Sequence, residues 1–183
     1  IITAGTITFL SSVGSIQVIE KIEENVEYGS DFILEAKAFL KEVIYEYRVK
    51  GTSEWTTEKP TEIGNYESRV TSKGIFGGQI SSEIFEFSIT KKKVTLSPMA
   101  GILTYGDDLE LIGELAYSDK AYANGFAIDV ETLGEVNFDK SFTNIKIYDK
   151  DNNDVTQCYD IELIDKKIQL LPRKITVKID PAE

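Results

Sequence analysis

The residues most able to do chemistry in this chain are acidic, and one group of them is spaced like a calcium-binding loop. Asp149, Asp151 and Asn153 occupy alternate positions, and Asp160 falls at the twelfth position of the same stretch. Oxygen ligands at these positions are typical of a calcium loop. The sixth position is Asp154, however, instead of the glycine that the sharp turn of such a loop needs. The stretch therefore favours a hairpin turn rich in Asp and Asn, with calcium binding as the alternative.

A second set of carboxylates lies in two turn-like segments. Asp107 and Asp108 are adjacent, and Asp31 occupies a similar place earlier in the chain. Glycoside hydrolysis needs two carboxyl groups held about 5–10 Å apart across a cleft. Because adjacent residues in a turn point in different directions, we expect these aspartates to cap turns and face water. No catalytic residue is assigned to them.

Trp55 is the candidate ligand-facing aromatic residue. Together with Tyr45, Tyr47, Tyr66 and Phe76 it could form a platform for a sugar or a peptide. If the run around the first two tyrosines is a strand, they share a face with its valines and belong to the core. Trp55 is flanked by polar residues and is left as the ambiguous member of the group.

The residue types that are missing exclude most catalytic and metal sites. The chain has no histidine, which removes Ser-His-Asp triads, Cys-His pairs and imidazole ligands to metals. Its one cysteine, Cys158, excludes an internal disulfide. The adjacent Gln157 has the wrong geometry for a thioester, so we expect Cys158 to pack as a small strand residue. The sequence predicts no enzyme and no cofactor.

The charge balance limits the partners. Asp and Glu number 31 against 20 Lys and Arg, a net charge of −11. Such a charge repels phosphate backbones and anionic lipid surfaces, which excludes nucleic acid as a partner. Apolar residues occur in short runs, such as residues 43–45, far below the ~20 that a membrane-spanning helix needs. We expect no direct membrane insertion.

Short runs of alternating apolar and polar residues indicate β-strands along the whole chain. They occupy residues 43–49, 85–90, 145–148 and 175–179, and turn residues separate such runs roughly every 8–12 positions. Residues 30–51 also place apolar side chains at helical spacing. The aromatic and β-branched content of 43–49 favours two strands over a helix there. The fold class predicted is all-β.

A repeated segment predicts two tandem domains. Residues 26–34, VEYGSDFIL, match residues 103–111, LTYGDDLEL, at an offset of 77. A period near 80 residues suits one small β-sandwich per copy. We expect two separate cores, joined by a nearly continuous strand between Thr90 and Val94. The expected limits are 1–13 for the last strand of a preceding module or an N-terminal extension, 14–92 for domain 1, 93–172 for domain 2, and 173–183 for the first strand of a following module.

Several short motifs then occur in a characteristic order. They are Y-x-Y at 45–47, W-T-T at 55–57, P-T at 60–61, G-N-Y at 64–66, F-S-I-T-K at 87–91, and I-Y-D with N-D-V-T and Y-D-I within 147–161. The first copy resembles the Ig-like repeats of large bacterial cell-surface proteins, and the second resembles their sister type, the MBG-type repeat. Asn152-Asn153 stands where the family tends to have glycine, which Asn can replace in a left-handed turn.

The resemblance implies two tandem Ig-like β-sandwich domains on a secreted, surface or cell-wall protein of a bacterium. It implies a structural, adhesin-like role as a spacer or binding stalk, and it carries over no catalytic residue. The partners it implies are neighbouring repeats of the same chain and a host or cell-wall glycan or protein. The alternative is a carbohydrate- or peptide-binding accessory module of a secreted enzyme.

Overall fold

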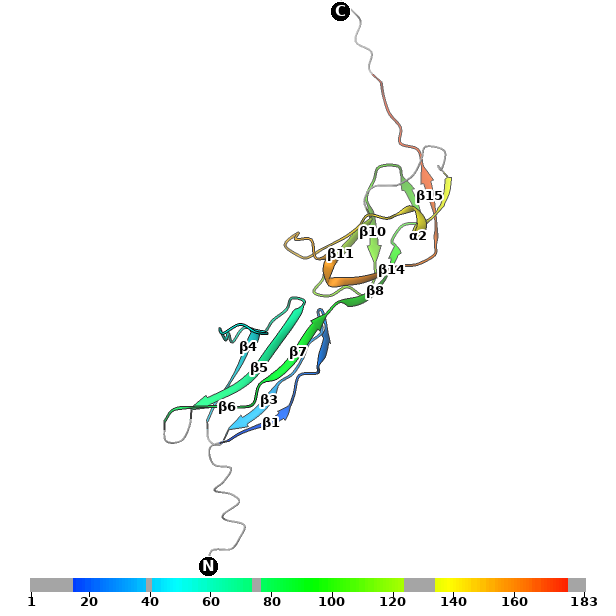
Figure 1. The fold of residues 1–183 in the computed structure, drawn as a ribbon. Coiled ribbons are helices and arrows are strands. Elements are labelled where there is room, and N and C mark those ends of the chain that lie inside the picture. The colour runs from blue at the N-terminus through cyan, green and yellow to red at the C-terminus, as the bar shows by residue number, and fades with distance from the viewer. Residues whose placement is uncertain (1–14, 39–40, 74–76, 124–133, 178–183) are drawn as a thin grey trace, which may run out of the picture. The chain divides into compact units, whose positions relative to one another are not determined.

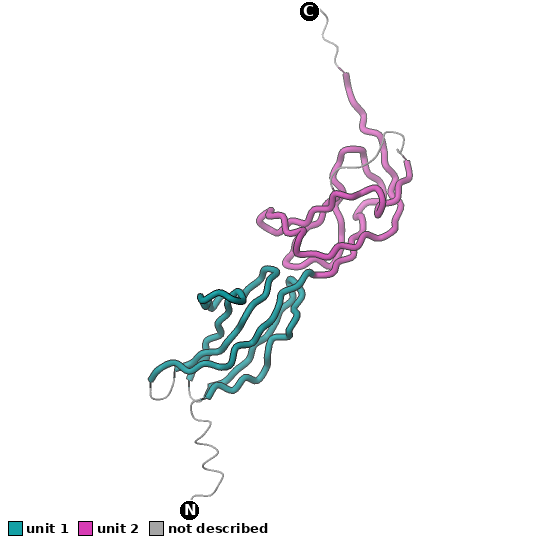
Figure 2. Tube along the Cα trace, in the orientation of Figure 1, with its two compact units in different colours: residues 1–91 teal, residues 92–183 magenta. Residues whose placement is uncertain are grey.

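The computed structural model describes residues 15–38, 41–73, 77–123 and 134–177. The chain divides into two compact units, residues 1–91 and 92–183 (Figure 2). The prediction of an all-β chain is confirmed, because the described residues of each unit form two sheets and the described helical turns, α2 (Phe138–Ser141) and η2 (Thr156–Cys158), are short. Within the described ranges, no helix has the length and apolar character needed to cross a membrane.

Unit 1 is built from a small antiparallel pair and a larger sheet (Figure 1). The pair is β1 (Ile16–Glu20) with β3 (Glu35–Ala38). The larger sheet has the order β2 (Asn25–Glu27), β7 (Phe85–Thr90), β5 (Gly64–Lys73) and β4 (Val43–Val49), and β6 (Gln79–Ser81) pairs with the far end of β5.

The choice between strand and helix near residue 45 is settled by β4. Its seven residues pair with β5 from Val43 opposite Ser72 to Val49 opposite Tyr66. Tyr47 is buried and its ring meets Phe87 edge-on at 6.5 Å, while its neighbours Glu46 and Arg48 face the other side of the sheet. The two-residue period of this pattern matches a pleated strand and not a helix. Of the earlier strand expected at 32–40, the structure assigns β3 to its second half, and residues 39–40 lie outside the described ranges.

Unit 2 also contains two sheets. The first has the order β13 (Ile145–Tyr148), β11 (Lys120–Ala123), β10 (Leu109–Ile112), β8 (Lys92–Pro98) and β14 (Tyr159–Leu163). The second has the order β12 (Gly134–Asn137), β15 (Lys167–Leu171) and β9 (Ile102–Thr104). Among the described residues of unit 2, the largest fully buried side chains are Leu96, Pro98, Leu109, Phe138, Phe142, Ile147, Ile168 and Leu170.

The repeated segment of the sequence has the same surroundings in both units. In each copy a short strand pairs in parallel with the last strand of its unit, β2 with β7 and β9 with β15. The tyrosine that follows donates its backbone N–H to that last strand, at 2.8 Å from Tyr28 to Thr90 and 2.8 Å from Tyr105 to Leu171. The next residue is a glycine with positive φ, 78° at Gly29 and 88° in its counterpart.

The structure describes the limits of the predicted domains only in part. Lys91 is the one residue between strands β7 and β8. The N-terminal strand expected within residues 1–13 lies outside the described ranges. In the segment expected to begin a following module, residues 173–177 form no strand, and Ile175 and Val177 are 77% and 74% exposed. A strand needs a hydrogen-bonded neighbour, so this expectation stays a prediction, as do the domain limits.

Candidate functional site

Trp55 lies on the outer face of the β4–β5 ladder in unit 1, against two guanidinium groups. The centre of its ring is 4.3 Å from the guanidinium carbon of Arg48 and 4.1 Å from that of Arg69. A cation over an indole face is attracted by the ring quadrupole. The half-buried indole is therefore held in place by two cation–π contacts, and no ring among the described residues stacks on it.

Both arginines are fixed by carboxylates on the facing strand. Arg69 Nε donates to Glu46 Oε2 at 2.8 Å, and Arg48 Nε donates to Glu67 Oε2. These pairs lie directly across the ladder, so opposite charges face each other at two successive outward positions. The side chains are also partly shielded from water, with at most 26% exposure. Each guanidinium group in contact with Trp55 is thus neutralised by a carboxylate.

The loop after β4 brings the tryptophan to this place. Thr56 exchanges two backbone hydrogen bonds with Tyr47, at 2.7 and 2.9 Å, along the outer edge of β4. This bridge lays the loop along the sheet edge and puts Trp55 beside the outward side chains of the strand. The contact depends on pairing between segments that are distant in sequence, which explains why the sequence left Trp55 ambiguous.

The other members of the predicted aromatic platform are elsewhere. Tyr47 and Tyr66 are buried on the inner face of the same sheet, where Tyr66 stacks on Phe87 with 5.6 Å between ring centres. The Tyr45 hydroxyl accepts the backbone N–H of Ala36 at 3.3 Å. The structure therefore does not bring these tyrosines to Trp55. Phe76 lies outside the described residues.

Three of the candidate calcium ligands, Asp149, Asp151 and Asn153, lie in the connection between β13 and β14, and the oxygens of Asp149 are hydrogen-bonded within this turn. Asp149 accepts hydrogen bonds from the backbone N–H groups of Asp151 and Asn153, both at 2.8 Å, and from Asn153 Nδ2 at 2.9 Å. These contacts, the Asn153 side chain first among them, lower the pKa of Asp149. Asn152 supplies the left-handed turn position, with φ 63°. The geometry is that of a side-chain-capped turn.

The remaining residues of that stretch complete the same turn. Asp154 accepts from Lys146 Nζ at 2.6 Å and from the backbone N–H of Thr156 at 3.0 Å, and these contacts lower the pKa of Asp154 to about 2. Asp160 is exposed on β14. Across the part of the chain that the structure describes, no three His, Cys, Asp or Glu residues gather in a metal-binding group.

Two aspartates of the repeated segment, Asp31 and Asp107, have cations as partners. In unit 1, Asp31 pairs with Lys59, which also donates to the carbonyl of Phe32 at 2.6 Å. In unit 2, Asp107 pairs with Arg173, whose Nε donates to the carbonyl of Tyr105 at 2.8 Å. Each pair ties the turn after the repeated tyrosine to a distant segment of its own unit. This arrangement suits turn stabilisation rather than general acid catalysis.

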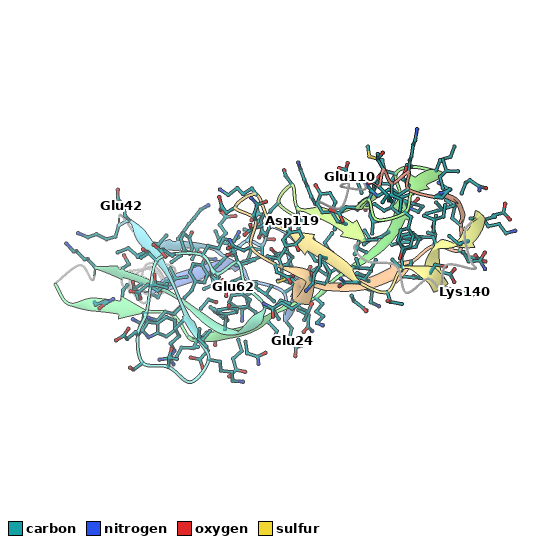
Figure 3. All side chains as sticks on the ribbon, turned by 90° about the horizontal axis from the view of Figure 1, so that it is seen from above. Glu24, Glu42, Glu62, Glu110, Asp119 and Lys140 are labelled. Carbon is teal, nitrogen blue, oxygen red and sulfur yellow. The ribbon has the colours of Figure 1, made fainter. Side chains whose placement is uncertain are left out.

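Sequence reasoning missed a buried carboxylate in unit 2, Asp119 (labelled in Figure 3). Its side chain lies in a tight turn in which Tyr117 and Ser118 both have positive φ, 47° and 68°. Asp119 Oδ2 accepts the Tyr159 hydroxyl at 2.7 Å, and that hydroxyl accepts the backbone N–H of Ala116 at 2.9 Å. Burial raises the pKa of Asp119, the hydroxyl of Tyr159 opposes the rise, and the charge of Asp149 adds to it. Cys158, next to this tyrosine, is buried.

Comparison with known proteins gives the following. No family model matches the chain, and no curated protein matches it. Among solved structures, the chain is similar to fibronectin(III)-like modules of Clostridium thermocellum CbhA, with 11% identity over 92% of this chain and 100% of that one and a TM-score of 0.29. It is also similar to the Bacteroides ovatus protein SGBP-B of a mixed-linkage glucan utilization locus, solved with a mixed-linkage heptasaccharide. There the identity is 8% over 85% of this chain and the TM-score is 0.29, and this chain spans 47% of that protein.

Proposed function

We propose that this chain is a non-catalytic segment of an extracellular bacterial protein, in which tandem β-sandwich units act as a spacer that withstands tension. The observation that carries this proposal is the parallel pairing of an early strand with the last strand in both units. The motif order that resembles bacterial cell-surface repeats supports the location.

The parallel ladder continues on both sides of the paired residues in the same way. Ser88 donates its backbone N–H to Glu24 at 2.8 Å in unit 1, and Gln169 donates to Gly101 at 2.9 Å in unit 2. When a unit is pulled from its two ends, parallel neighbouring strands slide past each other lengthwise. The hydrogen bonds of the ladder are then loaded together instead of opening one by one. Such a geometry resists extension, as a spacer requires.

Single-molecule force spectroscopy on the whole chain tests this function. We expect two unfolding events, each releasing roughly 200–250 Å of chain, which is the extended length of about 75 residues less the folded span. One event corresponds to each unit. A single event, or gradual extension without force peaks, would contradict the proposal.

A pair of proline variants in β2 tests the role of the ladder. Val26 lies midway between Glu24 and Tyr28, the two residues flanking β2 whose backbone bonds to β7 are given above. Its N–H therefore also faces β7, and Val26→Pro removes that donor. Asn25→Pro is the matched control, because the N–H of Asn25 points away from β7. We expect a lower unfolding force for unit 1 in Val26→Pro only. The event from unit 2 provides an internal standard in the same molecule.

A further inference from the structure

An open pocket of about 530 Å³ lies in unit 1 over the end of the β4–β5 ladder, beside β6. Its volume is in the range of pockets that hold small molecules, roughly 300–1,000 Å³. Its floor includes Ile44 from β4 and Thr71 from β5, which are directly opposite each other in the ladder. Ile44 is half exposed and offers an apolar surface there.

The lining is cationic in a chain that is strongly acidic. Lys41 and Lys73 contribute to it, and none of the lining residues that the structure describes is Asp or Glu. Neither lysine forms an ion pair with any residue that the structure describes. Because the net charge is −11, two lysines left without an acidic partner at one place create a local site for an anion.

The pocket also presents polar groups that could hold sugar hydroxyls. Thr71 is 1% exposed, and its Oγ1 has no hydrogen-bond partner. A buried hydroxyl without a partner costs stability, so a ligand that bonds to it gains what the free protein lacks. Gly77 and Gly78 leave open space where side chains would otherwise stand, and Gln79 adds an amide.

The surface around the pocket continues along β5 toward Trp55. Arg69, which lies against the tryptophan ring, is two residues from Thr71 on β5 and faces the same side of the sheet. Alternate residues of a strand are about 6.6–6.8 Å apart. A chain of sugar residues bound in the pocket would therefore reach the indole within one or two units.

We propose that the pocket lined by Lys41, Thr71 and Lys73 binds the carboxylate of an acidic polysaccharide of the uronic-acid type. The two ammonium groups hold the carboxylate, Thr71 and Gln79 bond to ring hydroxyls, and Ile44 contacts the apolar face of the sugar ring. This binding role goes beyond the spacer function and does not depend on it.

Isothermal titration calorimetry on the whole chain, with tetragalacturonate as the probe, tests the site. We expect a Kd of about 1 mM at low salt, typical of a few exposed polar and ionic contacts. A neutral galactose tetrasaccharide and inorganic phosphate are the comparison probes. We expect the neutral sugar to bind at least tenfold more weakly, because it lacks the carboxylates. Phosphate should also bind at least tenfold more weakly, because it makes no ring contacts.

Two variants with the same charge change locate the binding. Lys41→Gln with Lys73→Gln should weaken tetragalacturonate binding at least tenfold. Lys37→Gln with Lys91→Gln removes two exposed lysines that line no part of the pocket, and it should change the affinity less than twofold. Thr71→Val keeps the shape of the side chain and should weaken binding severalfold. Amide NMR shifts on binding should centre on Gly77 and Gly78.

Three results would overturn the assignment. Equal loss of affinity in the two lysine pairs would show that only net charge matters. Equal affinity for the neutral tetrasaccharide would remove the role of the carboxylate, and equal affinity for phosphate would remove that of the sugar ring. None of these results would alter the two force peaks expected of a spacer, so the two proposals fail separately.

Discussion

Asp119 has a carboxylate in the interior of unit 2, with one oxygen bonded to Tyr159 and the other, Oδ1, buried without a hydrogen-bond partner. Its side chain is 7% exposed. An ionised carboxylate in such a place is desolvated without full compensation. The turn that holds it also includes two residues with positive φ, so this part of unit 2 carries both backbone strain and an electrostatic cost.

Replacing this residue should therefore increase stability at neutral pH. Because the pKa of Asp119 is raised in the folded state, ionisation favours the unfolded chain. The wild type loses stability from this residue as the pH rises from about 4 through the folded pKa. Asp119→Asn keeps an acceptor for Tyr159 and removes the charge. We expect it to stabilise unit 2 by about 1 kcal/mol at pH 7, because a neutral amide costs less to bury there than a charged carboxylate.

Thermal unfolding from pH 3 to pH 7 checks this prediction. The difference between Asp119→Asn and the wild type should vanish near pH 3 and grow as the pH increases. The other acidic groups titrate in both proteins and cancel in the difference. A difference that is independent of pH would show that the hydrogen bond to Tyr159, and not the charge, determines the effect.

The contact between the end of β10 and β8 depends on a glycine that sequence patterns did not single out. A Cβ added at Gly113 would lie 2.7 Å from Leu96 Cδ2 and 2.8 Å from the carbonyl oxygen of Thr95. The carbonyl belongs to β8, which is held between β10 and β14, so it cannot move without disturbing the sheet. Gly113→Ala should destabilise unit 2 by about 1–3 kcal/mol, the usual cost of overpacking.

Gly101→Ala is the matched control for this substitution. A Cβ at Gly101 meets no atom within 4 Å, and its φ is not positive. Chemical denaturation followed by circular dichroism should show a lower midpoint for Gly113→Ala and little change for the control. Equal effects of the two substitutions would mean that glycine flexibility, and not the close approach to β8, determines the outcome.

The turn between β13 and β14 should need no cation. Its Asp149 and Asp154 oxygens already accept hydrogen bonds from within the turn and from Lys146. We expect the melting temperature to differ by less than about 2 °C between chelator and ~10 mM calcium. A site with a Kd of ~0.1 mM would add roughly 2.7 kcal/mol under those conditions and shift the transition by several degrees. A calcium-specific rise of about 5 °C, absent with magnesium and lost in Asp151→Ala, would establish a metal site.

Elements formed by local sequence were predictable, and contacts across long sequence distances were not. The alternation in residues 43–49 is visible in the sequence because a strand repeats every two residues. Trp55 instead depends on Arg69, and Asp119 depends on Tyr159, 40 residues away. The spacing of residues along the sequence does not predict which distant side chains the strand pairing will bring into contact. The fold class could therefore be predicted from the sequence, whereas the side chains that surround the candidate sites could not.

At the scale of the whole molecule, the duplication of the sequence corresponds to a duplication of hydrogen bonds. The repeated tyrosine and glycine keep the same backbone bond and the same positive φ in units whose sheets otherwise differ. Unit 2 adds β14 in parallel to β8, whereas β1 of unit 1 pairs only with β3 among the described strands. What the two units share is a parallel ladder between an early strand and the last strand, β2 with β7 and β9 with β15.

This parallel ladder also limits how early each unit can complete its fold. Val26 and Thr90 are 64 residues apart and meet across the ladder, so the last strand must be present before the early strand has its neighbour. Contacts of such long separation slow folding, because the chain must close a large loop before it gains them. At about 5–20 residues per second of synthesis, the ribosome needs roughly 3–13 s to make the intervening chain. During that interval the residues of β2 lack their ladder partner, and the net charge of −11 opposes association between unfinished chains.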